Sequence, residues 1–447
     1  MNFFFEPYKI KVVEPIFFTS KRERKKILEK AFYNIFKIPA NKITIDLLTD
    51  SGTNAMSEHQ WSKIMEADES YAGAESFERF CEEVKSFTGM DYVLPCHQGR
   101  GAERILAEYF SKKIKNPIVP SNTHFDTTKA NLNYIGAETP DFVINEALDP
   151  EKYHPFKGNM NTDNLKIFLE KYHKRVPAVF LVLTNNSMAG QPVSLQNVKE
   201  TREICEKFGI PLFLDISRIA ENAYFIKKRE EKNKSIKKII REIISYSDLC
   251  YMSAKKDGIS NIGGFIAVKD KKLYEELSMY LILWEGFPTY GGLSGRDLEA
   301  VAQGLKEATD EKYLEFRIKE VEFLGEELSK RGVPVYKPTG GHAVYVLAER
   351  VFDHIKRENF PGQVFSIALY LEGGIRVCEI GSLMHGKDAK FEFVRYAIPR
   401  RVYTESHLRY VAEVSKLVLE NKNKWKGVKL IKESPYLRHF SAEFVLL

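Results

Sequence analysis

The sequence is poor in cysteine, lacks a long apolar run and has no large excess of either charge sign. The cysteines are spread along the 447 residues, at Cys81, Cys96, Cys205, Cys250 and Cys378. They are odd in number and form no Cys-x-x-Cys motif, so we predict a reduced, cytoplasmic setting. No apolar run approaches membrane-spanning length, and Phe3–Phe5 is followed at once by Glu6, so we expect neither a membrane segment nor a signal peptide.

The net charge is small, and charged residues of both signs are distributed over the whole chain. The 67 basic and 61 acidic residues give a net charge of +6, which is too small and too diffuse for a nucleic-acid footprint. With 44% hydrophobic and 29% charged residues, the composition is that of an ordinary soluble globular protein long enough for two or three domains. Few glutamines beside many Lys, Glu and Ile favour a thermophilic source.

Two adjacent lysines, Lys255 and Lys256, follow an apolar, strand-like run from Ile243 to Tyr251 that Asp248 interrupts. Burial or a neighbouring cation lowers the pKa of a lysine, and the neutral amine can then form a Schiff base. Ser253, just before the pair, offers a hydroxyl to an anion. A solvated surface charge run is the alternative interpretation, and the pair alone leaves both open.

A glycine-rich turn lies between a short strand, Tyr92–Leu94, and a helix predicted from Ala102 to Phe110. It reads Gln98-Gly99-Arg100-Gly101, and a Gly-x-Gly turn at a helix start presents backbone N–H groups and a positive dipole end to phosphate. Arg100 would add a positive charge. The turn favours a phosphate site, and the alternative is a plain strand-turn-helix joint with a surface arginine.

Strands then alternate with helices, which predicts an α/β fold with a mostly parallel sheet and ligands at the carboxyl ends of its strands. The units are a strand at Ile118–Pro120, a strand at Ala178–Leu183, a helix at Val198–Phe208 and a strand at Pro211–Arg218 that carries an acid and an arginine at its carboxyl end. Phe125, in the loop after the first of these strands, either stacks on a planar cofactor or belongs to the core.

Asp215 follows four apolar residues, so we expect it to be at least partly buried and to need a partner. A protonated pyridine nitrogen of pyridoxal phosphate (PLP) is one such partner, because the acid keeps the ring an electron sink. Asp215 lies one strand-helix unit before Lys256, so both could reach one cofactor. An ion pair with Arg218 is the alternative.

The ends of the chain show other patterns. Ser20 can cap a helix from Lys21 to Phe36, a strand is expected at Ile43–Leu48, and the loop Asp68–Gly73 is interpreted as a helix terminus. The basic run Lys227–Arg241 is interpreted as a solvated face of an amphipathic helix.

The chain changes character near residue 311, after which a long helix at Tyr313–Arg331 precedes mixed elements. We therefore predict an N-terminal arm and helix at 1–44 packing with the small domain, a large domain at 45–310 and a smaller α+β domain at 311–447. Arg395, in a strand expected at Phe393–Arg400, either grips a substrate carboxylate or lies on a strand edge at the surface.

Several long runs resemble the β-eliminating lyases from near one end of the chain to the other. They are IDLLTDSGTNAMS at 45–57, HQGRGAE at 97–103, GQPVSL at 190–195, ENAYFIK at 221–227, MSAKKD at 252–257, EGFPTYGGL at 285–293 and IPRRVYT at 398–404. The resemblance implies a PLP-dependent enzyme of fold type I, like aspartate aminotransferase, that breaks a carbon–carbon bond of an aromatic amino acid.

The resemblance also implies roles for individual residues. Cofactor contacts would come from Lys256 as the Schiff-base lysine, Lys255 beside it, Gln98, Gly99, Arg100 and Ser253 at the phosphate, Phe125 and Asp215 at the ring, and Asn186 and Arg218 near the ring oxygen. Thr49, Ser51 and Arg395 would hold the amino-acid end of the substrate. Tyr71 and Tyr290 would reach a cofactor across a subunit interface of a homotetramer built as a dimer of dimers. Gly52, Glu69 and Asn261 match a monovalent-cation site, usually for potassium.

Three positions resemble the members of the family that act on tryptophan. Asp126 stands where the phenol-forming members have threonine, Ile380 where they have an arginine for the phenolic oxygen, and His439 where they have phenylalanine. Indole has an N–H for a carboxylate and no phenolic oxygen for an arginine. The expected reaction is β-elimination of L-tryptophan to indole, pyruvate and ammonia, with Tyr71 as the acid and with Asp126 and His439 orienting the indole.

Three alternatives stay open. The nearest is the same elimination on L-tyrosine, which gives phenol. Another PLP reaction, such as a cysteine-type β-elimination or a transamination, could be a side activity, and a catalytically silent PLP-binding protein is the alternative from a different class. One departure from the family is Ser187-Met188-Ala189-Gly190, which is bulkier than Ala-Gly-Gly and lies beside Asn186.

Overall fold

The computed structural model describes residues 5–447, and this part of the chain forms two compact units. Unit 1 comprises the described chain up to Asp50, Pro150–Tyr153 and Phe316–Leu447, and unit 2 comprises Ser51–Asp149 and His154–Glu315. The division between the units therefore falls within one long helix, α12 (Glu311–Lys330). The domain limits at 44, 310 and 311 stay predictions.

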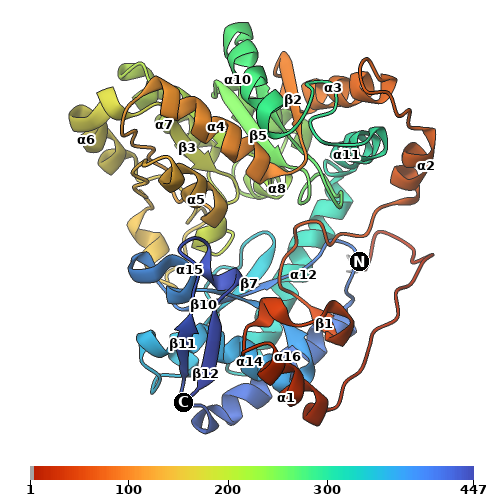
Figure 1. The fold of residues 1–447 in the computed structure, drawn as a ribbon, viewed down its shortest axis with the longest axis vertical. Helices are drawn as coiled ribbons and strands as arrows, with labels where there is room; N and C mark the ends of the chain where they lie inside the picture. Colours follow the sequence, from red (N-terminus) through yellow and green to blue (C-terminus); the bar gives the residue numbers. More distant parts are fainter. Residues whose placement is uncertain (1–4) are drawn as a thin grey trace. The chain divides into compact units, whose positions relative to one another are not determined.

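Unit 2 is built on a five-stranded sheet in the order β2-β6-β5-β4-β3 (Figure 1). Its strands are β2 (Tyr92–Cys96), β3 (Val179–Val182), β4 (Leu212–Asp215), β5 (Leu249–Ser253) and β6 (Gly264–Val268). The pairs β3–β4 and β4–β5 are parallel, whereas β6 runs antiparallel to both β5 and β2. The sheet is thus mixed and mostly parallel, and the α/β prediction is confirmed.

Helices cover both faces of this sheet. They are α2 (Glu58–Glu66), α3 (Glu75–Thr88), α4 (Gly99–Lys113), α5 (Asp126–Tyr134), α6 (Thr162–Tyr172), α7 (Leu195–Lys207), α8 (Ile219–Arg229), α9 (Ile236–Ser245), α10 (Lys271–Trp284) and α11 (Gly295–Glu307). Alternate strand residues such as Tyr251 and Ile266 share a core with Phe110 of α4 and Leu281 of α10. On the other face, Phe265 of β6 meets Phe80 of α3 edge to face at 6.3 Å between ring centroids.

Two predicted elements of unit 2 are wrong in extent. The run Ile243–Tyr251 is not one strand, because α9 ends at Ser245 and β5 begins at Leu249. Asp248 separates them, and its carboxylate accepts a hydrogen bond from Leu212 N at 2.9 Å, which holds the chain beside β4. Ile118–Pro120 is no strand either, since this segment makes only isolated bridges, such as Ile118 with Glu138.

Other expectations for unit 2 are confirmed. The basic run divides between the end of α8 and the start of α9, and the isoleucines of α9 are buried, as an amphipathic helix requires. Asp68 marks a helix terminus, because its carboxylate accepts hydrogen bonds from Glu75 N at 3.0 Å and Ser76 N at 2.9 Å at the start of α3.

Unit 1 contains a three-stranded antiparallel sheet in the order β7-β10-β9 and two smaller sheets, β1-β8 and β11-β12. The strands are β1 (Ile45–Asp46), β7 (Ala343–Leu347), β8 (Ile375–Arg376), β9 (Cys378–Ile380), β10 (Phe393–Ala397), β11 (Val428–Lys432) and β12 (Glu443–Leu446). The helices are α1 (Lys21–Lys30), α13 (Ala348–Val351), α14 (Pro361–Gly373), α15 (Ser382–His385) and α16 (Glu405–Glu420), with most of α12.

The N-terminal segment of unit 1 differs from its prediction. Ser20 caps α1 as expected, and Glu23 completes a capping box. The helix ends at Lys30 rather than Phe36, because Phe32 and Tyr33 adopt positive φ angles of 50° and 55° that a right-handed helix excludes. The strand expected at Ile43–Leu48 is reduced to β1.

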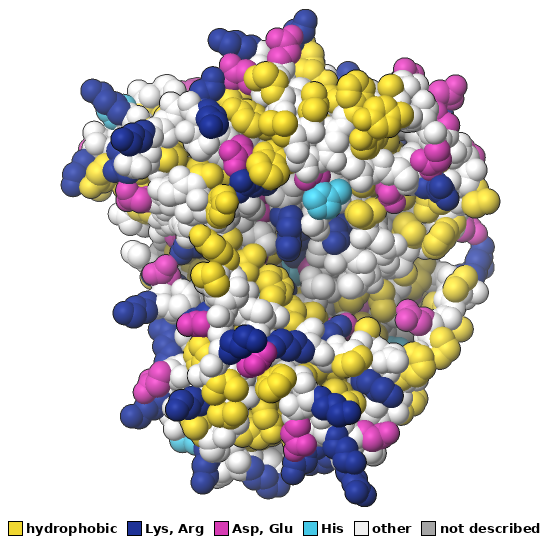
Figure 2. All heavy atoms as spheres, viewed as in Figure 1, with side chains coloured by type: hydrophobic (Ala, Val, Ile, Leu, Met, Phe, Trp, Pro, Cys, Tyr) yellow, Lys and Arg dark blue, Asp and Glu magenta, His cyan; other side chains and the backbone are white. Residues whose placement is uncertain are grey.

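No described helix is long and apolar enough to cross a membrane. On the face drawn in Figure 2, Lys and Arg side chains are scattered with Asp and Glu side chains among them.

Candidate active site

The glycine-rich turn of unit 2 begins helix α4 directly after β2. Gln98 is the N-cap of α4, and Gly99 and Arg100 form its first turn, with Arg100 exposed. A Cβ on Gly99 would lie 2.8 Å from the Cβ of Ser253, closer than side-chain atoms approach one another. Only glycine therefore lets the start of α4 approach the end of β5. The positive end of the helix and the hydroxyl of Ser253 meet there.

Lys256 lies buried in the turn after β5, with 8% of its surface exposed. Its Nζ is 5.7 Å from the centroid of the Phe125 ring, so the predicted Schiff-base lysine and the predicted stacking ring lie in one place. The next residue fixes the turn, because the carboxylate of Asp257 accepts hydrogen bonds from Ala220 N at 2.7 Å and Glu221 N at 3.2 Å at the start of α8. The surface-charge interpretation of the lysine pair is wrong.

Lys255 points to the other side of the same turn. Its Nζ donates to Gln98 Oε1 at 3.4 Å. Burial, and then the charge of Arg100, lowers the pKa of Lys255. Two cations and the start of α4 therefore face each other, an arrangement that favours a bound anion.

Asp215 is the last residue of β4 and is buried, as predicted. Its Oδ1 accepts a hydrogen bond from Ser217 N at 2.9 Å, and Ser217 Oγ in turn accepts from Ser253 N at 3.0 Å. Because these bonds join the ends of β4 and β5, the carboxylate is held beside the strand that leads to Lys256.

Glu103 has no role predicted from the sequence, and the structure places it beside these residues. Its carboxyl group is buried and accepts hydrogen bonds from Thr127 Oγ1 at 2.6 Å and Thr128 Oγ1 at 2.7 Å. Burial raises the pKa of Glu103 to about 7, the charge of Asp215 acts in the same direction, and that of Lys256 opposes it. The only sequence signal for Glu103 is that this acid lies on the apolar face of a predicted helix.

Asn186 and Arg218 lie buried at the ends of β3 and β4, respectively. Asn186 begins a 3₁₀ helix (Asn186–Met188), and Arg218 is the N-cap of α8. Arg218 N donates to Leu183 O at 3.2 Å, so both residues lie near the end of β3. The departure at Met188 and Ala189 is absorbed by the core, because both side chains are buried.

Asp126 is the first residue of α5 and is half-buried directly after Phe125. Its Oδ1 accepts a hydrogen bond from Thr127 N at 2.7 Å. The carboxylate thus lies at the positive end of α5, which stabilises its ionised form.

Tyr71 and Tyr290 meet each other in unit 2, with ring centroids 5.1 Å apart, and Phe287 stacks on Tyr71 at 5.9 Å. Tyr71 is 71% exposed. Its hydrogen bond with Tyr290 raises the pKa of Tyr71, so this phenol keeps its proton at neutral pH, as a general acid must.

The predicted cation ligands are only partly together. Asn261 Nδ2 donates to Gly52 O at 3.0 Å and to Asn54 O at 3.1 Å. Glu69 instead accepts from Gly295 N at 3.0 Å and Arg296 Nε at 2.8 Å at the start of α11. Among residues 5–447, no group of three or more His, Cys, Asp or Glu side chains could hold a metal ion.

Arg395 lies in β10, the central strand of the unit 1 sheet, and is 7% exposed. Its Nη2 donates to Leu48 O at 3.1 Å, so it reaches the segment that holds Thr49. The strand-edge interpretation of Arg395 is therefore wrong. The next residues in chain order, Asp50 and Ser51, fall on either side of the division between the units.

A second arginine, Arg400, was missed. Its Nη1 contacts Asp50 Oδ2 at 3.0 Å, and both side chains are fully buried. A buried pair of this kind fixes the chain before Ser51, since neither charge can be left alone in the core. The run IPRRVYT contains Arg400, but 350 residues separate it from Asp50, so no local pattern indicates the pairing.

Ile380 and His439 are both buried in unit 1. Ile380 ends β9 and pairs with Phe393 of β10. The His439 ring lies 4.1 Å from the Phe440 ring and 5.7 Å from the Phe36 ring, and Asn34 Nδ2 donates to its backbone oxygen at 3.2 Å.

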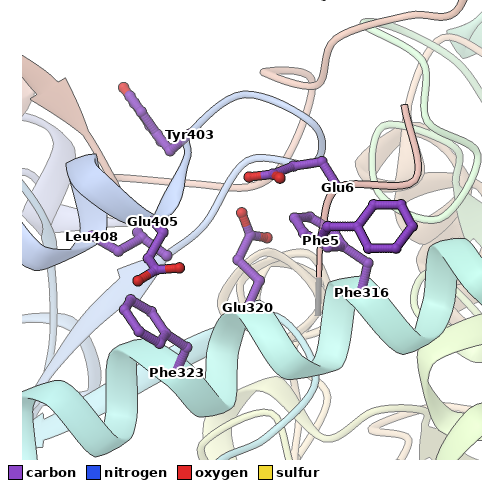
Figure 3. A pocket seen from close by; sticks show the side chains of 8 residues that line it. All are labelled: Phe5, Glu6, Phe316, Glu320, Phe323, Tyr403, Glu405 and Leu408. Atoms are coloured by element: carbon purple, nitrogen blue, oxygen red, sulfur yellow. The ribbon is translucent and has the colours of Figure 1, made fainter. Parts of the chain in front are cut away.

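A small pocket in unit 1 contains none of the predicted site residues. Its lining consists of Phe5, Glu6, Phe316, Glu320, Phe323, Tyr403, Glu405 and Leu408. Figure 3 shows the carboxyl groups of Glu6 and Glu320 pointing toward one another. Burial raises the pKa of Glu320 to about 7, and Arg317 opposes this shift. A volume of about 30 Å³ suits water, not a cofactor.

Comparison with known proteins fits this geometry. Residues 46–414 match the family described as Beta-eliminating lyase. The chain belongs to this family. A tryptophanase of Salinibacter ruber is 49% identical over 99% of this chain and 95% of its own length. A tyrosine phenol-lyase of Symbiobacterium thermophilum is 42% identical over 98% of both chains.

Solved structures share the fold of this family member at low sequence identity. Serine palmitoyltransferase of Sphingomonas wittichii aligns with a TM-score of 0.63 at 12% identity, covering 90% of this chain and 97% of that one. A structure of SPT with PLP aligns with a TM-score of 0.62 at 15% identity over the same shares. The chain thus has the fold of the fold-type I PLP enzymes.

Proposed function

We propose that this β-eliminating lyase uses PLP to convert L-tryptophan into indole, pyruvate and ammonia. The observation that carries the proposal is the buried Lys256 facing the Phe125 ring, beside the buried acids Asp215 and Glu103. The similarity to tryptophanases across nearly the full chain supports the reaction class.

The residues of unit 2 fit the cofactor. Gly99 and Ser253 leave a backbone cradle at the positive end of α4 in which a larger residue would clash. Arg100 and Lys255 supply positive charge for a phosphate, and Gln98 caps the helix beside them. Asp215 would hold a proton on the pyridine nitrogen, since a buried carboxylate favours a cationic partner. Asn186 and Arg218 would lie near the ring oxygen.

PLP, when bound, supplies an electron sink for the pair of electrons released at the substrate Cα. Lys256 would attach the cofactor and, once its amine is free, accept the Cα proton. Arg395, with Thr49 and Ser51, would hold the α-carboxylate and the amino-acid end, and a guanidinium does so with two parallel hydrogen bonds.

Release of indole needs a proton on the ring carbon that bears the side chain. Tyr71 would donate this proton, and its raised pKa keeps the proton available. Asp126 would accept the indole N–H from its place at the start of α5. His439 would orient the ring from unit 1.

Substrate choice is proposed from three positions. Asp126 can accept the indole N–H, whereas Ile380 offers a phenolic oxygen no hydrogen-bond donor from its side chain. His439 provides a polar ring where a phenylalanine would not. A site built to bond one polar group discriminates strongly against a substrate that lacks it.

The decisive experiment incubates purified protein, PLP and a potassium salt with L-tryptophan or L-tyrosine and measures indole, phenol and pyruvate. We expect indole and pyruvate in equal amounts from tryptophan, with no such product from Lys256→Ala. Phenol in excess of indole would mean a tyrosine phenol-lyase and contradict the substrate assignment. If neither indole nor phenol forms although PLP is bound, the lyase function is contradicted. The protein is then a catalytically silent PLP-binding protein.

Two further features belong to the proposal. Gly52, Glu69 and Asn261 would bind a potassium ion, with the Gly52 carbonyl as one ligand. The chain would assemble as a homotetramer in which Tyr71 and Tyr290 act at the site of a neighbouring subunit, and the exposure of Tyr71 in one chain fits that role. The potassium site is tested by measuring activity without potassium. The homotetramer is tested by measuring the mass of the purified protein by light scattering.

A further inference from the structure

The turn that follows Ile380, residues Gly381–Met384, is held by two buried carboxyl groups. Glu379 accepts hydrogen bonds from Leu383 N at 3.0 Å and Met384 N at 3.2 Å. Glu392 accepts from Ser382 N at 3.1 Å and Ser382 Oγ at 3.0 Å. Both acids are buried, at 2% and 3% exposure, and the reaction described above uses neither of them.

The two carboxyl groups crowd the same glycine. A Cβ on Gly381 would lie 2.7 Å from Glu379 Oε1 and 2.7 Å from Glu392 Oε2. Arg357 pairs with Glu392, at 2.6 Å from Nε to Oε1. The guanidinium therefore compensates the charge of Glu392, and Glu379 lies beside this pair.

Glu379 is the acid that keeps its proton. Burial, and then the charge of Glu392, raises the pKa of Glu379 to about 8. Other charged groups around the turn are Glu349, whose Oε2 accepts from Glu392 N at 3.2 Å, and Arg438. His385 ends the short helix α15 that contains the turn.

Arg438 holds the turn from the opposite side. Its Nε donates to Leu383 O at 2.7 Å and its Nη2 donates to Ser382 O at 2.7 Å. The residue after Arg438 is His439. The turn thus joins Ile380, which immediately precedes it, to His439, which lies almost 60 residues later in the chain.

We propose that Glu379 and Arg438 are positioning residues for substrate selection, because both hold the turn Gly381–Met384, which follows Ile380 directly and is bound by the residue before His439. The inference rests on the proposed function, in which Ile380 and His439 face the aromatic ring of the substrate. Neither Glu379 nor Arg438 touches the reacting atoms. They act through the backbone of Gly381–Met384, so their loss should change recognition of a large ring more than recognition of a small side chain.

The test compares Glu379→Ala, Glu379→Gln and Arg438→Met in the holoenzyme. L-tryptophan and L-alanine are titrated while the absorbance of bound cofactor is followed, which gives a ratio of affinities without turnover. We expect Glu379→Ala and Arg438→Met to lower the preference for tryptophan about tenfold, since each leaves buried backbone groups unpaired. Glu379→Gln should lower the preference less than Glu379→Ala, because its one amide oxygen can still accept from one of the two backbone N–H groups.

A structural readout and a control accompany the titration. Hydrogen exchange should show lost protection at both Leu383 and Met384 in Glu379→Ala and at only one of the two in Glu379→Gln. Glu413→Gln is the matched control, because Glu413 pairs with Arg331 on the exposed surface of the same unit. It should leave both the ratio and the exchange unchanged.

The pH dependence distinguishes positioning from plain stability. Above pH 8 the wild type should lose preference for tryptophan, because deprotonated Glu379 would face ionised Glu392, and Glu379→Gln should not. If wild type responds to tryptophan and the ratio is unchanged in Glu379→Ala and Arg438→Met, the inference is wrong and the function stands. If wild type binds tryptophan no better than alanine, the proposed substrate is wrong.

Discussion

The candidate residues of unit 2 and unit 1 are held in place in different ways. In unit 2, Asp215, Ser253 and Lys256 stand at the ends of neighbouring strands, and short backbone hydrogen bonds to Ser217 and Asp257 fix them. In unit 1, Arg395, Ile380 and His439 lie within an antiparallel sheet and a distant turn, and buried charges such as Arg400 hold the surroundings.

The difference coincides with a division of proposed roles: unit 2 holds the residues for the cofactor chemistry, and Ile380 and His439 of unit 1 serve substrate recognition. The carboxyl ends of parallel strands meet at one edge of a sheet, so any sequence with this order of strands gathers its cofactor residues there. An antiparallel sheet gives no such guarantee. The recognition residues of unit 1 therefore depend on particular pairs of buried charges, and these are open to change without loss of the cofactor site.

The largest effect is expected at the chemistry of unit 2. Lys256→Ala should lower tryptophan turnover about 10⁴-fold or more, because the cofactor loses its attachment and the Cα proton its acceptor. Lys255→Ala should keep covalent attachment and lose cofactor affinity instead. Borohydride reduction followed by peptide mass spectrometry reads the attachment site, and a label on Lys255 would contradict the assignment.

The buried pair of unit 1 should show the next largest effect, on stability. Arg400→Met leaves Asp50 charged and buried without its partner, so we expect a loss of about 3–5 kcal/mol in the free energy of unfolding. Chemical denaturation measures it. Lys416→Met, which removes a half-exposed lysine of α16, is the control and should cost less than about 1 kcal/mol. Equal losses in both variants would show that burial of the pair is unimportant.

Asp215→Asn should reduce kcat about 10²–10³-fold while leaving the fold intact, since the amide cannot hold a proton on the pyridine nitrogen. Steady-state kinetics with saturating cofactor measures the loss. A variant that loses only cofactor affinity and regains full turnover at high PLP would contradict the role given to this carboxylate.

Glu103 should make the stability of the apoprotein depend on pH. Its pKa is about 7 in the folded chain and near 4.5 when exposed, so the folded state binds the extra proton between these values. The stabilisation is complete below about pH 4.5 and is lost as pH rises to about 7, by roughly 3 kcal/mol. The thermal unfolding temperatures of the wild type and of Glu103→Gln should diverge between about pH 4.5 and pH 7. If the two temperatures change in parallel with pH, this role of Glu103 is wrong.

The smallest effect is expected at recognition. Ile380→Arg with His439→Phe should shift the ratio of tryptophan to tyrosine turnover about tenfold toward tyrosine, because the arginine can bond the phenolic oxygen. Product assay of indole and phenol measures this shift. Cofactor absorbance should not change, and a lost cofactor band would show that unit 1 contributes to more than recognition.

Local patterns were enough to identify most of the unit 2 site. Apolar runs ending in polar residues predicted β4 and, with a start that is too early, β5, and Asp215 was assigned correctly to a buried position. The Gly99 turn was recognisable because a strand, two glycines and a helix lie within about twenty residues. Each of these signals comes from neighbours along the chain.

The sequence by itself determined the alternation of strands and helices and the places where polar residues follow strands, because both depend on local periodicity. Only the tertiary structure decided that α9 and β5 are separate, that Arg395 is central in its sheet, and that Glu103 joins Asp215. It also decided the buried pair Asp50–Arg400. These partners are far apart in the chain, so burial and charge bring them together only after folding, when no unpaired charge can remain in the core.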